Sequence, residues 1–479
     1  MSILIKGGRV VTASDDYVGD VFIEGETVEL LGRSLDIQAD RIIEATGKYV
    51  IPGGIDPHTH LDTPGTFLDT VTVDDFTSGT VAAAFGGTTT EIDFCFQLPG
   101  QTFPQALASW HEKLERCPPV IDVGFHMAIT DLREHGTLEG LAALGDEGVT
   151  SYKLFLAYKG GMMVDDETLF RTLEVGGESG SLVMVHAENG DAIDILVKRA
   201  LAEGKTEPRW HAATRPPLTE AEATNRAIML AQVAGCPVYI VHVSCREAVE
   251  PIARARAQDW RVWGETCTQY LFIDETMLEK PDFEGAKYVF TPPPRKKEQQ
   301  EHLWHALRTG ALSVVSTDHA PFNFVGQKDL GRHDFSKIPN GAPGIEDRLR
   351  MLYHFGVRPG RISLNQLVEL TATAPARLFG LYPRKGTIAV GSDADIVVFD
   401  PEKLQTISAS DPRTHHSKVD YSLYEGTEVV GAPEIVLVRG TIVVDDDELV
   451  AEPGHGRFVR RARFGEELSA AGERPGIAD

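Results

Sequence analysis

The stretch YVIPGGIDPHTH, residues Tyr49–His60, joins an apolar run to two histidines that are separated by one residue. The run Tyr49–Ile55 predicts a buried strand, and residues two apart in an extended chain face the same side. We therefore expect His58 and His60 to project together at the carboxyl end of this strand. Imidazole nitrogens are common ligands of zinc and similar ions, so the pattern favours a metal site over two unrelated histidines.

Seven further apolar runs follow along the chain, and helical stretches separate most of them. The eight expected strands are Tyr49–Ile55, Thr88–Phe94, Val120–Ala128, Thr150–Ala157, Ser181–His186, Pro237–Val243, Arg261–Glu265 and Leu312–Thr317. This alternation predicts an α/β fold of the parallel (β/α)8 type, a TIM barrel. A doubly wound open sheet is the alternative, and the lack of a G-x-G-x-x-G motif after the first strand weighs against it.

Three more side chains that bind metals lie at or just beyond the ends of predicted strands: His186, His242 and Asp318. The carboxyl ends of all strands in a parallel barrel share one face. We therefore expect these three side chains to converge with His58 and His60. Chance placement explains any one of them more easily than the whole set.

Lys153 lies inside the predicted strand Thr150–Ala157. Burial of its ammonium group is costly and favours the neutral amine. A neutral amine can add carbon dioxide to form a carbamate, whose two oxygens can bridge two divalent ions. The alternative is a lysine whose ammonium reaches solvent at the barrel rim.

The two ends of the chain have a similar sequence pattern, in which short runs of alternating apolar residues are separated by glycine turns. Ile3–Val11 (ILIKGGRVV) matches Val436–Val444 (VLVRGTIVV) in pattern. We expect residues 1–50 and 385–455 to form one small, discontinuous β-sandwich domain beside a catalytic barrel of residues 51–384. Residues 456–479 lose periodicity and are expected to form a C-terminal arm, either on a neighbouring subunit or frayed.

The composition limits the partners and the compartment. The 479 residues carry a net charge of −25 at pH 7, so neither nucleic acid nor an anionic membrane is an expected partner. No run approaches the roughly 18 apolar residues of a transmembrane span. The five cysteines are scattered, which argues against a disulfide framework. We therefore expect a cytoplasmic protein.

The chain resembles the binuclear-metal amidohydrolase superfamily and, within it, the dihydropyrimidinase or hydantoinase family. The residues discussed above carry the likeness, together with stretches spread over nearly the whole chain. These stretches are GGIDPHTHLD (Gly53–Asp62), FGGTTT (Phe85–Thr90), SYKLFLAYK (Ser151–Lys159), MVHAENGD (Met184–Asp191), WGETCTQYL (Trp263–Leu271), NGAPGIEDR (Asn340–Arg348) and KGTIAVGSDADIV (Lys385–Val397).

The resemblance implies two divalent ions, usually zinc, bridged by a carboxylated Lys153 (N6-carboxylysine) and by a hydroxide. One ion would be bound by His58, His60, Lys153 and Asp318, and the other by Lys153, His186 and His242. Asp318 would also carry a proton between the attacking hydroxide and the leaving nitrogen. Such proteins are commonly homotetramers or homodimers.

The resemblance also implies how a substrate is bound. Tyr158 would donate a hydrogen bond to the developing oxyanion, and the backbones of Thr291 and Asn340 would bind the ring amide. The loop Thr63–Thr70 (TPGTFLDT) departs from the family pattern. The resemblance therefore does not determine which size or stereochemistry of ring substituent the pocket accepts. Phe67, Leu68, Phe155 and Met162 are candidates for its wall.

The expected reaction is hydrolysis of a dihydropyrimidine such as dihydrouracil, or of a 5-substituted hydantoin, to an N-carbamoyl amino acid. An allantoinase or a dihydroorotase is the alternative within the superfamily, but Thr63–Thr70 and Asn340–Gly344 contain no basic residue for a charged substituent. A non-catalytic relative of dihydropyrimidinase is a third possibility. It is disfavoured because all six ligand positions are filled.

Overall fold

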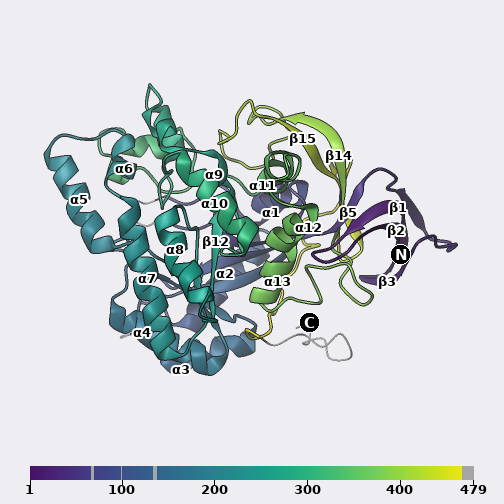
Figure 1. Ribbon diagram of the computed structural model, residues 1–479, viewed down its shortest axis with the longest axis horizontal. Coiled ribbons are helices and arrows are strands. Elements are labelled where there is room, and N and C mark those ends of the chain that lie inside the picture. The colour runs from purple at the N-terminus through teal and green to yellow at the C-terminus, as the bar shows by residue number, and fades with distance from the viewer. Residues whose placement is uncertain (66–69, 99, 133–136, 466–479) are drawn as a thin grey trace.

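The computed structural model describes residues 1–65, 70–98, 100–132 and 137–465, and it contains an α/β barrel with a second sheet beside it (Figure 1). The barrel sheet has eight strands, and every neighbouring pair is parallel. A bridge between Thr59 and His319 links the last strand region to the first, so the barrel is nearly closed. This confirms the predicted fold class. The strands are β6 (Gly54–Thr59), β7 (Thr88–Phe96), β8 (Asp122–Ala128), β9 (Ser151–Phe155), β10 (Leu182–His186), β11 (Val238–Ile240), β12 (Val262–Cys267) and β13 (Val314–Ser316).

Helices follow the barrel strands and surround the sheet (Figure 1). Three of them begin with a capping box, at Asp75, Thr102 and Ser363, in which the cap side chain and the third helical residue satisfy each other's backbone N–H. The α-helices are α1 (Phe76–Phe85), α2 (Phe103–Arg116), α3 (Leu138–Ala143), α4 (Asp166–Ser179), α5 (Gly190–Ala202), α6 (Arg209–Ala213), α7 (Pro217–Ala234), α8 (Arg246–Arg256), α9 (Thr268–Phe272), α10 (Glu298–Thr309), α11 (Arg348–Leu352), α12 (Leu364–Val368) and α13 (Ala374–Leu378).

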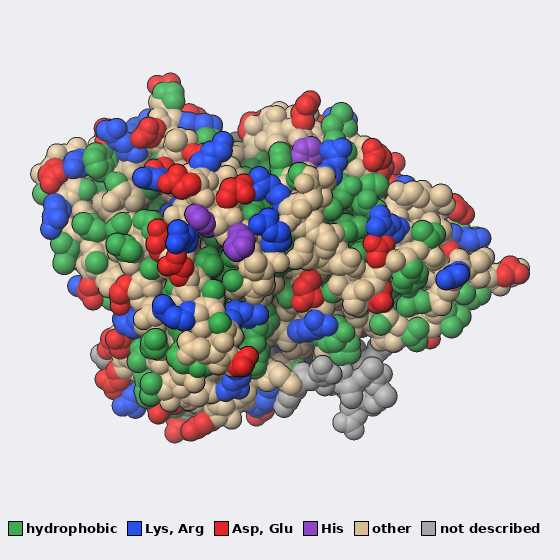
Figure 2. All heavy atoms as spheres, viewed as in Figure 1, with side chains coloured by type: hydrophobic (Ala, Val, Ile, Leu, Met, Phe, Trp, Pro, Cys, Tyr) green, Lys and Arg blue, Asp and Glu red, His purple; other side chains and the backbone are tan. Residues whose placement is uncertain are grey.

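Shorter helical turns complete the connections. The 3₁₀ turns are η1 (Leu144–Glu147), η2 (Glu275–Glu279), η3 (Glu284–Tyr288), η4 (Lys328–Gly331) and η5 (Phe335–Lys337), and the π turns are η6 (Tyr353–Val357) and η7 (Glu369–Thr373). Among the described residues, no helix has both the length and the apolar character needed to cross a bilayer. Acidic and basic side chains are interspersed over the face drawn in Figure 2.

The second sheet is built from both ends of the chain, as predicted. Its order is β17-β16-β15-β14-β5-β1-β2-β3, with β4 paired to β1. The antiparallel pair β5–β14 joins the two halves, and Pro52 lies opposite Ile396. The strands are β1 (Ser2–Val11), β2 (Asp16–Glu24), β3 (Thr27–Gly32), β4 (Arg41–Glu44), β5 (Tyr49–Pro52), β14 (Ile396–Thr406), β15 (Glu428–Val438), β16 (Thr441–Asp445) and β17 (Glu448–Leu449).

The predicted first barrel strand, Tyr49–Ile55, is wrong in its bounds. Tyr49–Pro52 is β5 of the second sheet, and the barrel strand β6 starts at Gly54 and continues to Thr59. Gly53 between them lies so close to β7 that an added Cβ would be 2.1 Å from Oγ1 of Thr89. A single apolar run therefore crosses from one sheet to the other at a glycine.

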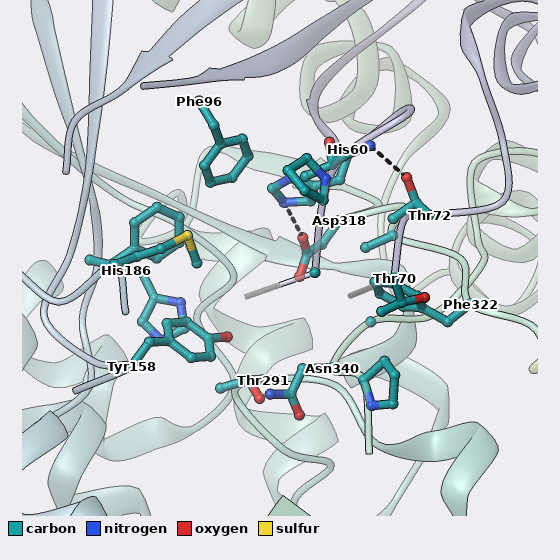
Figure 3. Close-up of a pocket in the computed structure, with 18 of the residues that line it drawn as sticks. His60, Thr70, Thr72, Phe96, Tyr158, His186, Thr291, Asp318, Phe322 and Asn340 are labelled. Carbon is teal, nitrogen blue, oxygen red and sulfur yellow. Dashed lines mark hydrogen bonds and ion pairs between the residues drawn. The ribbon is translucent and has the colours of Figure 1, made fainter. Parts of the chain in front are cut away.

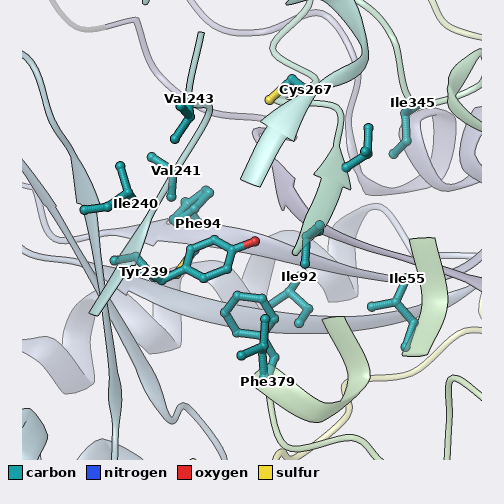
Figure 4. Packing of buried hydrophobic residues seen from close by; sticks show 14 of the residues in the cluster. Ile55, Ile92, Phe94, Tyr239, Ile240, Val241, Val243, Cys267, Ile345 and Phe379 are labelled. Carbon is teal, nitrogen blue, oxygen red and sulfur yellow. The ribbon is translucent and has the colours of Figure 1, made fainter. Parts of the chain in front are cut away.

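Each sheet has its own apolar core. Inside the barrel, Ile55, Ile92, Phe94 and Tyr239 are buried together, and Phe379 of the final helical segment lies beside them (Figure 4). The second core is enclosed by strands from both ends of the chain and includes residues such as Ile3, Val21, Val50, Ile396 and Leu437.

A buried ion cluster joins the barrel to the second sheet. The Nζ atom of Lys385 lies 2.8 Å from Oδ2 of Asp122, which begins β8, and 2.5 Å from Oδ2 of Asp395, which precedes β14. Arg439 also pairs with Asp122. Burial alone would raise the pKa of Asp122, but the two cations hold it well below its usual range.

Residues 456–465 contact the barrel of their own chain. The amide of Val459 donates to the carbonyl of Val123 at 2.8 Å, and the amide of Phe464 donates to Gly180 at 2.7 Å. The buried guanidinium of Arg461 donates to Oγ of Ser151 at 2.8 Å, at the start of β9. This part of the predicted C-terminal arm therefore covers the amino ends of the barrel strands, whereas residues 466–479 lie outside the described residues.

Candidate metal centre and substrate pocket

The first predicted ligand set converges where β6 and β13 end. His58 is on β6, His60 follows that strand, and Asp318 lies two residues beyond β13. The Nε2 atoms of both histidines lie 3.1 Å from Oδ1 of Asp318. Burial would raise the pKa of Asp318, but His58 and His60 hold it well below its usual range. These three side chains form a group that can hold a metal ion.

Lys153 lies on β9 with none of its surface exposed. Its Nζ atom is 4.9 Å from the ring centroid of Phe94 and 5.1 Å from that of Phe155. No hydrogen-bond partner for Nζ is found in the described part of the chain. Burial lowers the pKa of Lys153 to about 7, although Asp318 and Glu265 act in the opposite direction. Such an amine has the lone pair that carbamate formation needs.

The second predicted set lies beside the first. His186 ends β10 and His242 lies two residues past β11, and their ring centroids are 4.5 Å apart. The rings of His242 and His58 are 5.4 Å apart, which links the two sets. The Nδ1 atom of His242, like Nζ of Lys153, has no hydrogen-bond partner among the described residues. These two buried nitrogens, together with the imidazoles and Asp318, fit a pair of divalent ions.

Backbone strain is found at three of the predicted site residues. Tyr158, His242 and Asp318 have φ values of 68°, 40° and 51°, in the left-handed region that residues other than glycine seldom adopt. Such conformations cost on the order of 1–3 kcal/mol each and persist where surrounding structure imposes them. Here each of these residues lies two or three positions past the end of a barrel strand, and each side chain lines the pocket at the mouth of the barrel.

Two buried glutamates that the sequence reasoning did not identify orient the histidines. Glu265 of β12 is hydrogen-bonded to Nδ1 of His58, and Glu188 lies 2.9 Å from Nε2 of His186. Each contact leaves the other ring nitrogen for a metal. Both glutamates are fully buried. Their positions in the sequence could have indicated this role, because Glu265 ends a predicted strand and Glu188 follows His186 by two residues.

The remaining predicted residues line the pocket above these ligands. Tyr158, Thr291 and Asn340 lie on one side of it, and His60 and Asp318 lie on the other (Figure 3). Phe155 and Met162 also contribute to the wall. The other two wall candidates, Phe67 and Leu68, lie outside the described residues.

The segment that carries Thr291 is held from beneath by His211 of α6. The Nε2 atom of His211 lies 2.9 Å from the carbonyl oxygen of Phe290, and its Nδ1 atom accepts from the guanidinium of Arg215 at 3.0 Å. This second contact requires the proton to be on Nε2. His211 therefore donates to the backbone immediately before Thr291.

Comparison with known proteins agrees with this geometry. The model of the amidohydrolase family matches residues 49–443. A D-hydantoinase of Geobacillus stearothermophilus is 54% identical over 465 residues, covering 97% of this chain and 98% of its own. A dihydropyrimidinase of Arabidopsis thaliana is 41% identical, covering 96% of this chain and 86% of its own.

A solved structure supports the same assignment. The crystal structure of dihydropyrimidinase from Brevibacillus agri NCHU1002 superposes with a TM-score of 0.94 at 55% identity, covering 97% of this chain and 100% of that one. The chain therefore belongs to the amidohydrolase family, and within it to the branch of the hydantoinases and dihydropyrimidinases. Within its site, His58, His60 and Asp318 form a group that could hold a metal ion.

Proposed function

We propose that this protein is a metal-dependent cyclic-amide hydrolase that opens hydantoin or dihydropyrimidine rings to N-carbamoyl amino acids. One observation carries the proposal: His58, His60, Lys153, His186, His242 and Asp318 converge at the carboxyl ends of the barrel strands, beneath a pocket with ring-binding groups. The relatives described above bear the names of enzymes of this class.

The metal assignment is part of the proposal. His58, His60, Asp318 and a carboxylated Lys153 would hold one zinc ion, and the same lysine with His186 and His242 would hold the other. When bound, such ions supply Lewis acidity that activates water and polarises a carbonyl. Asp318, within 3.1 Å of two imidazoles, would accept the proton of the attacking water and return it to the leaving ring nitrogen.

The pocket residues have separate tasks. Burial raises the pKa of Tyr158, and Glu188 raises it further, so the phenol keeps its proton and can donate to a developing oxyanion. The backbone N–H and C=O groups of Thr291 and Asn340 would bind the amide edge of the ring. A backbone contact does not depend on the identity of the side chain at position 291.

The lining disfavours a charged substituent. Phe96, Phe155, Met162 and Phe322 are apolar, and Lys153 is the only lysine or arginine among the described lining residues. An allantoinase or a dihydroorotase needs a cation for the ureido or carboxylate group of its substrate. The pocket favours an unsubstituted ring or one with an apolar substituent.

The proposal is tested by ring opening with the purified, zinc-loaded protein. The panel is dihydrouracil, hydantoin, the D and L forms of 5-phenylhydantoin, allantoin and dihydroorotate, followed by loss of ultraviolet absorbance. We expect cleavage of dihydrouracil or of a hydantoin. Cleavage of only allantoin or dihydroorotate, or of nothing with two metals bound, would contradict the substrate assignment.

Two further predictions about the whole molecule accompany this function. We propose a homotetramer or homodimer, which light scattering on the eluting protein would identify by mass. Residence in the cytoplasm is also still a prediction, and fractionation of the source cells would test it.

A further inference from the structure

Lys328, the first residue of η4, is fully buried outside the metal centre. Its Nζ atom lies 2.7 Å from the carbonyl oxygen of Val289, 2.7 Å from that of Pro339 and 2.6 Å from that of Gly341. No carboxylate is paired with it in the described part of the chain. A buried lysine whose hydrogen bonds all go to backbone carbonyls is unusual, since buried charges are normally paired.

The three carbonyls belong to the two segments that flank the ring-binding residues. Val289 lies two residues before Thr291, and Pro339 and Gly341 lie on either side of Asn340. The amide of Gly341 also donates to the carbonyl of Val289 at 3.1 Å. One side chain therefore joins the backbones of both segments.

The contacts require the charged form of Lys328. Burial lowers its pKa, but only an ammonium offers three N–H groups to three acceptors. A neutral amine would place its lone pair against an oxygen. Hydrogen bonds from a charged donor are shorter and stronger than neutral ones, which suits a rigid attachment.

The neighbouring side chain extends the same arrangement to a third segment. The amide nitrogen of Gln327 donates to Oγ1 of Thr70 and to the carbonyl of Val71, both at 2.7 Å. Thr70 is also one of the residues that line the pocket. Residues 327 and 328 thus contact three of the segments that line the pocket, and neither is itself among the lining residues.

We propose that Lys328 is a positioning residue, which sets the spacing of the Thr291 and Asn340 backbones that bind the ring amide. The inference rests on the proposed function of those two residues. It requires that loss of the ammonium weaken substrate binding while the metals stay in place.

The test compares two buried-lysine variants of the zinc-loaded protein. Lys328→Met removes the three donors and keeps a similar shape, and Lys385→Met removes the ammonium that faces Asp122 and Asp395, remote from the pocket. We expect Lys328→Met to raise KM by about tenfold or more, because misplacement by ~1 Å costs on the order of a hundredfold. Zinc content should remain at the wild-type value. Lys385→Met should leave KM unchanged even where it lowers Tm.

An equal rise in KM in both variants, an unchanged KM in Lys328→Met, or zinc loss that accounts for its lost activity would each overturn the inference. Should Lys328→Met not fold, Lys328→Gln, which keeps two N–H donors, should show a smaller rise in KM.

Hydrogen exchange gives a readout independent of activity. The amides of residues 289–291 and 340–342 should exchange at least about tenfold faster in Lys328→Met than in Lys385→Met. If the wild type opens no ring, the proposed function fails, and the exchange rates alone decide whether Lys328 holds the two segments.

Discussion

Glu265 is hydrogen-bonded to Nδ1 of His58, and this contact determines which nitrogen of the imidazole faces Asp318. The second oxygen of Glu265 accepts from the hydroxyl of Tyr239 at 2.9 Å, so the carboxylate is itself held in place. The His58 imidazole on β6 is therefore oriented by two further buried side chains, Glu265 of β12 and Tyr239 of β11. Such support by a hydrogen-bonded carboxylate is typical of histidines that bind metals.

Glu265→Gln should weaken metal binding by about tenfold to a hundredfold, because outer partners of metal ligands typically have effects of that size. The measurement is the zinc dissociation constant in competition with a chelator. Glu250→Gln, at an exposed site on α8, is the matched control and should keep the wild-type constant. Equal constants for the two variants would show that Glu265 does not support His58.

Lys153→Ala should abolish both metal loading and activity, since it removes the proposed bridge between the two ions. Metal analysis and ring opening on the same sample measure both effects. Lys159→Ala is the control, because Lys159 is half exposed and paired with Asp191. Full activity of Lys153→Ala would refute the bridging role.

Metal loading should depend on pH through Lys153. Burial lowers the pKa of its amine to about 7, so the reactive neutral form predominates above that pH and the ammonium below it. Reconstitution of metal-free protein with zinc, at fixed partial pressure of carbon dioxide, should slow as the pH falls through about 7. Loading that is equally fast at pH 6 and pH 8 would argue against carbamate formation.

Tyr158→Phe should lower kcat by about a hundredfold to a thousandfold, the usual effect of removing one oxyanion donor, and should not change zinc content. Tyr152→Phe is the control. Its hydroxyl donates to the carbonyl of Leu141 on the outer side of the barrel, so its loss should affect stability by about 1 kcal/mol and not kcat. Similar kcat values for the two variants would show that Tyr158 does not stabilise the oxyanion.

Asp122→Asn should lower the free energy of unfolding by about 3 kcal/mol, because Lys385 and Arg439 lose the buried carboxylate that they share, while Lys385 keeps Asp395. The cations hold the pKa of Asp122 well below its usual range, so its stabilising effect is present above the unfolded pKa and lost on acidification. Denaturant unfolding should thus show the gap between wild type and variant shrinking below about pH 4. If the difference in the free energy of unfolding between wild type and variant did not change with pH, the negative charge of Asp122 would not be its cause.

The barrel, and the convergence of the candidate metal-binding side chains, could be predicted from the sequence because their geometry follows from a simple rule. Strand ends of a parallel barrel meet on one face, so His186, His242 and Asp318 could be placed together before any coordinates were known. The bounds of the first strand were wrong because one apolar run serves two sheets. Hydrophobic pattern carries no signal of which sheet a strand joins.

The supporting residues were harder to predict for physical reasons. Glu265 and Glu188 have the same pattern as any polar residue at the end of a strand, and only burial against an imidazole gives them a role. Lys328 begins the four-residue turn η4, which is too short for a periodic pattern to indicate which way a side chain points. Its partners are backbone carbonyls, which leave no trace in the identity of the residues that bear them.

The pairing of β5 with β14 has a consequence for synthesis of the chain on the ribosome. Pro52 lies opposite Ile396, so the second sheet cannot be completed until most of the polypeptide has emerged. Strands β1 to β3 can pair early as local hairpins, but the edge of β5 that β14 covers stays open while the barrel forms. An unpaired edge of this kind can pair with strands of other molecules, so we expect this edge of β5 to be a site where the nascent chain is prone to aggregate.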